Sequence, residues 1–551
     1  MAAPEDSGAK RTAVTAGHFG PDADRRSAED RAHRGDIKGA LGVVSSLDTG
    51  PRRTLSHRLT TLLAVMGPGL VVMVADNDAG GISTYAQAGQ QYGLRLVWLL
   101  ALLAPVLYVN QEMVSRLGAV TGSGHARLIV ERFGRRWGAF ALSDLLALNF
   151  LTLVTEFVGV SLSLGYFGIS RFLSVPSAAV LLITATATGS FRRWERAMYL
   201  GIIASLVAIP LLVLSRTHEP SAHLTLPVVP GAHASGVLLV IALVGTTVAP
   251  WQLFFQQSNV VDKRITARFL GYERIDTAIG TVLFIIGALA ILLACAFAFG
   301  GTSLHGTFSD AAAVADGLRE RVGSTAGSLF AVALLDGSLI GASVVTLATS
   351  YAVGDYFGLR HSLHRRWSSA PTFHRTYAAS VVLAAGAVLV PGVPLGLVTT
   401  VVQALAGVLL PSATVFLLLL CNDRAVLGPW VNPRWLNALA TTVVGALLGL
   451  SALLTLTTVF RTLPVVATAI GLGTALVLAM GIVAITSGKR GAGGEHQVLD
   501  DSPVWTMPPI ESIEAPATSR SRTFGLVVLR CYLVLAVALL VAKVVKVALG
   551  S

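Results

Sequence analysis

Two aspartates stand inside the first long apolar stretch of the chain, within the segment GPGLVVMVADNDAGG. A charged group at the centre of a membrane helix costs at least about 2.5 kcal/mol, so Asp76 and Asp78 are expected to serve a function unless a buried basic residue pairs with them. Gly80 and Gly81 follow directly, and paired glycines loosen a helix and free its carbonyl oxygens. Because carboxylate and carbonyl oxygens are ligands of hard cations, this stretch predicts a cation site.

A second apolar stretch is interrupted near its centre, within VGTTVAPWQLFF. Pro250 removes a helix hydrogen bond, which on its own is compatible with a simple proline kink. Two interrupted helices in corresponding halves of a chain, however, are typical of a transporter whose substrate binds at the membrane midplane. We therefore place Asn77, Trp251 and Gln252 on the substrate path, beside the two aspartates.

Two further polar residues stand deep in apolar runs. Gln403, eight positions before Pro411, either offers its amide oxygen to the cation or bonds a neighbouring helix. Glu156, in LNFLTLVTEFVGVSL, is either a proton-relay group or a protonated acid bonded to a neighbour. Both alternatives stay open for each residue.

The elements that must hold these groups are membrane helices. The 551 residues are 53% hydrophobic and 13% charged, with a mean hydropathy of +0.69, whereas a soluble chain is about a quarter charged. Runs of about 20 apolar residues can cross a bilayer core of about 30 Å. Such runs recur at 60–92, 95–117, 138–165, 174–190, 197–215, 235–260, 275–300, 326–355, 376–392, 394–421, 437–460, 463–486 and 524–548.

The basic residues cluster in every second loop between these runs. This positive-inside bias predicts a multi-pass protein of the plasma membrane with a cytoplasmic N-terminus, and no basic stripe suggests a nucleic-acid partner. Residues 1–55 are expected to be a disordered cytosolic tail, and 56–486 the transporter domain. Residues 487–523 are expected to be a flexible cytosolic linker, and 524–551 an additional transmembrane or membrane-associated helix.

Several segments of the chain resemble the Nramp family of divalent metal transporters, namely QAGQQYGLRLVW, RLGAVTG and CNDRAVLGPWVNPRWLN. The resemblance covers about residues 67–437 and is strongest to the Nramp-related magnesium transporters. It implies an all-α integral membrane protein with a LeuT-type inverted-repeat fold of five plus five helices. Helices 1 and 6 would be broken, and two or three extra helices would follow at the C-terminus.

The candidate metal site departs from the classical family pattern. Classical Nramps carry Asp-Pro-Gly-Asn in the first broken helix, and the matching stretch here is DAGG, so the asparagine ligand becomes Gly81. Their Met-Pro-His in the sixth helix becomes APW here, which puts Ala249 in place of the methionine. Gln403 matches a glutamine that joins metal coordination in some states of the family. The resemblance thus implies a site at Asp78, Asp76, Gly81, Ala249 and Gln403.

These departures favour a hard cation. Thioether sulfur selects softer transition metals, whereas oxygen ligands suit Mg²⁺, which usually keeps several of its waters. We therefore expect secondary-active or facilitative transport of Mg²⁺, and also of Mn²⁺, in a partly hydrated form by alternating access. The metal would be cargo, with no cofactor, and the chain would act as a monomer. Trp251 replaces a family histidine and Leu153 a family aspartate, which leaves Glu156 as candidate relay and predicts weak or absent proton coupling.

Other functions fit the sequence less well. A classical proton-coupled Mn²⁺/Fe²⁺ importer would be expected to keep the methionine. An organic-solute transporter of the same fold would place two aspartates against a substrate carboxylate. A channel would be expected to build its pore from several subunits. An enzyme is not expected, because the spans contain no nucleophile elbow, Cys-His arrangement or His/Glu ligand pair.

Overall fold

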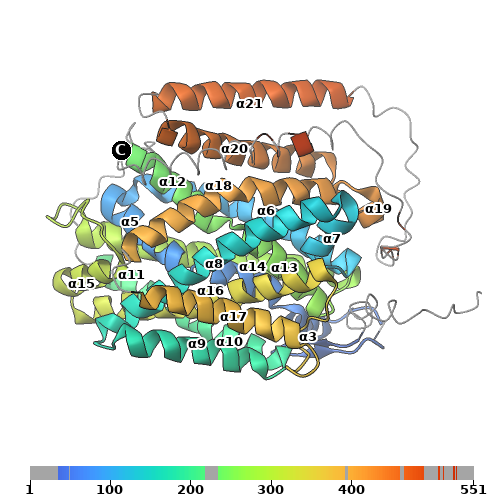
Figure 1. Cartoon of the computed structure of the whole chain (residues 1–551), viewed down its shortest axis with the longest axis horizontal. Helices are drawn as coiled ribbons and strands as arrows, with labels where there is room; N and C mark the ends of the chain where they lie inside the picture. The colour runs from blue at the N-terminus through green and yellow to red at the C-terminus, as the bar shows by residue number, and fades with distance from the viewer. Residues whose placement is uncertain are drawn as a thin grey trace, which may run out of the picture.

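The computed structural model describes residues 35–48, 50–216, 234–390, 395–459 and 464–488, together with residues 505, 507, 508, 513, 525–527, 529 and 531. Within this part the chain is almost wholly helical (Figure 1). Eight helical stretches among the described residues are long and apolar enough to cross a membrane, or nine if a bent pair counts as one span. The predicted all-α membrane architecture is therefore confirmed.

The first half of the bundle begins with a helix that is broken twice. Its helices are α3 (Leu55–Val65), α4 (Pro68–Ala75), α5 (Ala79–Tyr92), α6 (Val97–Thr121), α7 (His125–Phe133), α8 (Arg135–Tyr166), α9 (Arg171–Ala187), α10 (Phe191–Ser205) and α11 (Ala208–Arg216). A 3₁₀ turn, η1 (Gly93–Leu96), joins α5 to α6. The bend between α3 and α4 is 50°.

The second half also begins with a broken helix. Its helices are α12 (Ala234–Thr247), α13 (Pro250–Asp262), α14 (Leu270–Phe299), α15 (Ala311–Arg321), α16 (Ser324–Phe357), α17 (Pro371–Leu389), α18 (Leu395–Cys421) and α19 (Arg424–Leu427). The 3₁₀ turns η2 (Ala267–Phe269) and η3 (Gly428–Trp430) belong to this half. Two longer helices follow, α20 (Arg434–Val459) and α21 (Val465–Gly488), and they lie along one edge of the bundle beyond α18 (Figure 1).

Each apolar run expected between 60–92 and 463–486 overlaps one or more of these helices. The predicted last run over 524–548 and the predicted linker over 487–523 fall almost entirely outside the described residues. Two of the expected extra C-terminal helices are thus present as α20 and α21.

The two broken helices lie inside the bundle. Helices α4 and α5 pack against α14, α12 packs against α18, and α8 packs against α16. Every residue of α4 is buried. Non-helical backbone at membrane depth is tolerated only where protein or a cavity surrounds it, and this packing meets that condition for both breaks.

Residues 35–48, which we call the N-terminal strap, pack onto one end of the bundle. Strands β1 (Ile37–Lys38) and β2 (Val43–Val44) pair antiparallel, and the apolar residues Ile37 and Val44 are buried against α3 and the η2 region. The backbone amide of Ala40 donates to the carboxylate of Glu195 in α10.

The strap corrects one sequence expectation. Disorder was expected over residues 1–55, but residues 35–48 are held by buried apolar side chains and by hydrogen bonds to α10 and to Arg264. Composition alone misses this, because the segment is polar on average and only a few side chains meet the bundle. Residues 1–34 lie outside the described part.

Candidate functional site

The break in the first helix is held open by its own residues. Asp76 follows the last residue of α4, and Asp78 is the N-cap of α5 with extended backbone dihedrals. Oδ1 of Asp78 accepts a 2.6 Å hydrogen bond from the amide of Gly81, a role for which aspartate is among the preferred residues. In a continuous helix that amide would bond the carbonyl of Asn77, so the cap frees this carbonyl.

The break in the sixth helix has a different cause. Ala249 is the N-cap of α13, with extended dihedrals and no side-chain hydrogen bond, and Pro250 is the first residue of the helix. Proline has no amide hydrogen to continue a helix from α12, and it is well tolerated at the first position of a new one. The predicted interruption at Pro250 is therefore present as a true break between α12 and α13.

The two breaks meet at Gly81. A β-carbon built on Gly81 would lie 2.8 Å from the carbonyl oxygen of Asp76, 3.1 Å from Oγ1 of Thr246 and 3.3 Å from Oδ1 of Asp78. The space beside Gly81 is thus bordered by a carbonyl, a hydroxyl and a carboxylate oxygen. These are the donor types that hard divalent cations prefer.

A chain of amides ties the breaks together. The amide nitrogen of Gln252, in α13, donates to Oδ1 of Asp76, and Oε1 of Gln252 accepts a 2.9 Å hydrogen bond from Gln111 of α6. Oδ2 of Asp76 is buried and has no hydrogen-bond partner among the described residues. Asp76 therefore keeps one oxygen available for a ligand.

Glu156 lies against the same break. Its Oε2 accepts a 3.1 Å hydrogen bond from the amide of Ala79, and its carboxyl group interacts directly with that of Asp78. Both side chains border Gly341, where a β-carbon would lie 2.9 Å from Cβ of Asp78 and from Oε2 of Glu156. Two carboxyl groups this close repel when both are charged, and a bound cation would offset that repulsion.

Gln403 reaches the site from α18. Its side chain lies directly over Gly80, so closely that any β-carbon at this position would overlap its amide group. Gln403 is 3% exposed, and its Nε2 makes no hydrogen bond within the described part of the chain. The sequence left two roles open for Gln403, a ligand of the cation or a hydrogen bond to a neighbouring helix. Among the described residues, Nε2 does not make such a hydrogen bond.

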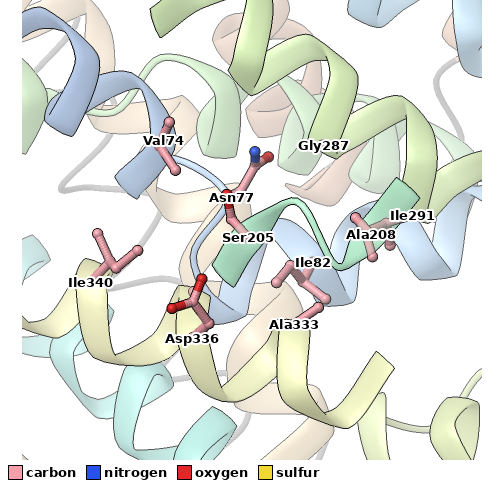
Figure 2. Close-up of a pocket in the computed structure, with 11 residues that line it drawn as sticks. Val74, Asn77, Ile82, Ser205, Ala208, Gly287, Ile291, Ala333, Asp336 and Ile340 are labelled. Atoms are coloured by element: carbon pink, nitrogen blue, oxygen red, sulfur yellow. The ribbon is translucent and has the colours of Figure 1, made fainter. Parts of the chain in front are cut away.

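The remaining predicted residues do not all face the aspartates. Ala249 and Trp251 are buried and present only a methyl group and an indole. The amide nitrogen of Asn77 donates to the carbonyl of Phe284, 3.2 Å away on α14, and the side chain enters a separate cavity (Figure 2). Asn77 therefore belongs to the break, but its side chain lies apart from the carboxylates.

The described residues contain no group of three or more His, Cys, Asp or Glu side chains arranged to hold a metal ion. A cation here would instead use two aspartates supplemented by neutral oxygens. Sequence reasoning missed Thr246 as a neighbour of Gly81 and Gln111 as a support for Gln252. Both residues are polar and stand inside apolar runs, which marks them as candidates in the sequence. The sequence does not show which residue on another helix each of them contacts.

The chain is similar to known proteins over most of its membrane part. Residues 69–457 match the model of the natural resistance-associated macrophage protein-like (Nramp) family. A protein of Ralstonia nicotianae described as divalent metal cation transporter MntH is 31% identical over 405 residues, covering 69% of this chain and 87% of that protein. The protein of the same description from Burkholderia ambifaria is 26% identical over 452 residues, covering 77% and 94%.

A solved structure has the same fold. The crystal structure of the Eremococcus coleocola manganese transporter, in complex with an aromatic bis-isothiourea substituted compound, matches with a TM-score of 0.59 at 21% identity. The match covers 82% of this chain and 98% of that one. Together with the paired broken helices, it supports the predicted LeuT-type arrangement of five plus five helices.

Proposed function

Since the chain belongs to the Nramp family of divalent metal cation transporters, we propose that its cargo is Mg²⁺ with part of its water shell, and that Mn²⁺ is also carried. The protein is a multi-pass membrane transporter and not an enzyme, and the divalent metal is its substrate. The choice of Mg²⁺, and membership of the Nramp-related magnesium transporters, are our own inferences from the site.

The proposal rests on the oxygen-bordered space beside Gly81. The carboxylates of Asp78 and Asp76, the carbonyl of Asp76, and the amide oxygen of Gln403 are the donors we assign to the cation. Ala249 contributes no sulfur, and sulfur is the ligand that would favour a softer metal. An all-oxygen site is what Mg²⁺ prefers.

Small residues stand at both breaks. Gly81 has no side chain and Ala249 has only a methyl group, so neither side chain offers a ligand atom that would replace a water on the ion. Mg²⁺ loses its waters reluctantly and is usually bound through one or two carboxylates with several waters kept. Two aspartates, with no side-chain ligand from Gly81 or Ala249, fit that manner of binding.

Weak or absent proton coupling is part of the proposal. Trp251 is fully buried, carries no titratable group, and occupies the position after Pro250. Leu153 is apolar, so Glu156 is the carboxyl group that remains beside Asp78. If proton movement is tied to metal movement at all, Glu156 is the residue we expect to carry it.

Alternating access would occur around the two breaks. In transporters with discontinuous helices, one repeat or bundle rocks against the other around a substrate site at the midplane. Gln252 links the break of the first helix to α13. We further propose that the protein is a monomer in the plasma membrane. Its N-terminus is placed in the cytoplasm because basic residues cluster in every second loop.

Uptake of Mg²⁺, Mn²⁺ and Ca²⁺ should be measured side by side in proteoliposomes, with a pH dye inside. We expect uptake of Mg²⁺ and Mn²⁺, with little acidification of the lumen. Uptake of Mn²⁺ without Mg²⁺ would indicate a proton-coupled Mn²⁺/Fe²⁺ importer of the classical type instead. Clear metal-driven acidification of the lumen would contradict weak proton coupling. It would not bear on which metal is carried, which the uptake measurements decide.

A further inference from the structure

The N-terminal strap, residues 35–48, lies beside α3 at one end of the bundle (Figure 1). Its buried residues Ile37 and Val44 share one apolar cluster with Val65, the last residue of α3, and with Val260 of α13. Helix α3 begins the first broken helix, and α13 is the second part of the sixth. One short segment therefore packs where the ends of both broken helices meet.

The backbone of the strap lies directly on α3. A β-carbon on Gly39 would overlap the backbone carbonyl of Ala64 and would lie 3.2 Å from Nζ of Lys263. A β-carbon on Gly42 would lie 3.1 Å from that of Ala64. Two glycines thus allow a contact between the strap and α3 that larger residues would prevent.

Two arginines hold the two ends of the strap. Arg264 donates a 3.4 Å hydrogen bond to the carbonyl of Asp36, and Arg268 donates a 2.7 Å hydrogen bond to the carbonyl of Asp48. Both arginines lie between α13 and α14. The strap is therefore bound to the segment that directly follows the sixth helix, as well as to α3.

A chain of polar contacts leads from the middle of the strap to the bend of the first helix. The amide of Ala40 donates to Glu195 of α10, and Glu195 pairs with Nζ of Lys263 at 2.5 Å. Lys263 also donates a 2.6 Å hydrogen bond to the carbonyl of Met66, the C-cap of α3. Consecutive contacts thus join the strap, α10, the end of α13 and the end of α3.

The arrangement that the strap holds together is one in which the candidate metal site is closed. Asp76 is 0% and Asp78 3% exposed, and every residue of α4 is buried. With the N-terminus in the cytoplasm, α3, α4 and α13 lie on the cytosolic side of the two breaks. Under alternating access these helices must separate before an ion at the breaks can reach the cytosol.

We propose that the N-terminal strap is an autoinhibitory latch, which holds the cytosolic side of the transporter closed and detaches when the metal is released. The strap binds the ends of both helices that have to separate, so its contacts stabilise the closed arrangement. A contact that is made in one conformation only shifts the population toward that conformation. The inference rests on the proposed orientation and on alternating access, but not on Mg²⁺ as the cargo.

The variant that tests the latch is Gly39→Ala. Its methyl group would overlap the backbone of α3, so the strap has to lift from the bundle. Gly50→Ala is the matched control, because the nearest atom to the added β-carbon is 3.6 Å away, an ordinary van der Waals distance. Ile37→Ala removes buried apolar contacts of the strap and serves as a second weakening variant if Gly39→Ala does not fold.

Attachment of the strap can be measured by labelling a thiol. Val44→Cys places a cysteine at a strap position that is 7% exposed, and Cys531→Ser removes the exposed native cysteine, since the other two are buried. A membrane-impermeant maleimide is added to inside-out membrane vesicles. We expect labelling at least about fivefold faster in Gly39→Ala than in the parent protein, as for the loss of a contact of ordinary strength, and no change in Gly50→Ala.

Opening of the cytosolic side is measured by metal uptake into cells that express each protein at the same level. Gly39→Ala and Ile37→Ala should take up metal at least about twofold faster than wild type, because a larger fraction of the protein can open to the cytosol. Gly50→Ala should match the wild type. The ratio to wild type is taken separately for Mg²⁺ and for Mn²⁺, so uptake of Mn²⁺ alone would contradict the proposed cargo, while a raised ratio for Mn²⁺ would still support the latch.

Faster labelling of the strap without faster uptake, in both weakening variants, would overturn the latch, because the strap would then detach without opening the protein. Slower uptake in both would also overturn it, since the strap would then assist transport. Unchanged labelling in both variants would show that the strap is a fixed part of the fold. Labelling in right-side-out vesicles only would contradict the proposed orientation, and the cytosolic latch with it.

Discussion

The backbone amide of Gly81 donates its hydrogen bond to Oδ1 of Asp78 over 2.6 Å. The aspartate that we assign to the metal therefore also shapes the break at which we propose the metal site. Removing its side chain would remove a helix cap, which would lower the stability of the protein by about 1 kcal/mol, and would also remove a proposed metal ligand. A decisive variant must separate these two roles.

Gly80 is expected to tolerate no side chain. In Gly80→Ala the new methyl group would overlap the amide of Gln403, so we predict a lower melting temperature and strongly reduced metal uptake. The double variant Gly80→Ala/Gln403→Ala should recover the melting temperature, because the three atoms nearest to the new methyl group all lie beyond Cβ of Gln403. Gly386→Ala is the control, as no atom lies within 4 Å of that position. A Gly80→Ala variant as stable as Gly386→Ala would refute the contact.

Ala249 is expected to set the preference among metals. Ala249→Met places a thioether at the N-cap of α13, at the break of the sixth helix, and should shift uptake from Mg²⁺ toward Mn²⁺ and softer ions. Ala249→Leu has similar bulk without sulfur and should reduce uptake without that shift. The measurement is uptake of Mg²⁺ in competition with Mn²⁺. The same selectivity in Ala249→Met and Ala249→Leu would contradict the idea that a sulfur ligand at this position sets the preference for the metal.

The N-terminal strap is expected to depend on a buried ion pair. Nζ of Lys263 lies 2.5 Å from Glu195 and donates to the carbonyl of Met66 over 2.6 Å, while Glu195 also accepts from Ala40. Lys263→Met leaves a buried carboxylate unpaired, and such losses cost about 3–5 kcal/mol. The melting temperature should fall clearly.

The control for the strap is an exposed ion pair. Arg319 and Asp316 lie 3.0 Å apart with more than half of each side chain exposed, and such pairs contribute little. Arg319→Met should therefore leave the melting temperature almost unchanged. A Lys263→Met variant that melts like Arg319→Met would show that the buried pair does not hold the strap.

His125 is expected to make the protein sensitive to acid. Burial at the start of α7 lowers the pKa of His125 to about 4, below the value of about 6.5 in an unfolded chain. Between pH 6.5 and 4 the unfolded state binds more protons, so stability falls as the pH falls. In His125→Gln the melting temperature should decline less over this range, whereas the exposed His57→Gln should behave as wild type. Equal slopes in all three proteins would contradict the assignment.

Much of the fold could be predicted because the bilayer imposes long apolar runs. Carboxylates and a proline inside such runs marked both breaks, at Asp76–Asp78 and at Pro250. The pairing of Glu112 with Arg116 on one helix was also predictable, and it is present at 3.2 Å. Such a pair can be predicted from its spacing in the sequence, because residues four apart on a helix are neighbours.

Contacts between distant helices were not predictable. The bonds of Gln252 to Asp76 and Gln111 join three helices, and no spacing in one sequence reveals them. The strap was missed because three buried side chains, those of Ile37, Ala40 and Val44, do not change the composition of a polar segment.

The most direct test of the account is Mg²⁺ uptake by wild type and Asp78→Asn in proteoliposomes, with melting temperatures measured in parallel. Asparagine caps a helix as well as aspartate does, so the variant should keep the break and the stability while losing the ligand charge. The account predicts Mg²⁺ uptake by the wild type, at least a tenfold loss in Asp78→Asn and closely similar melting temperatures. Undiminished Mg²⁺ uptake by a stable Asp78→Asn protein would contradict it.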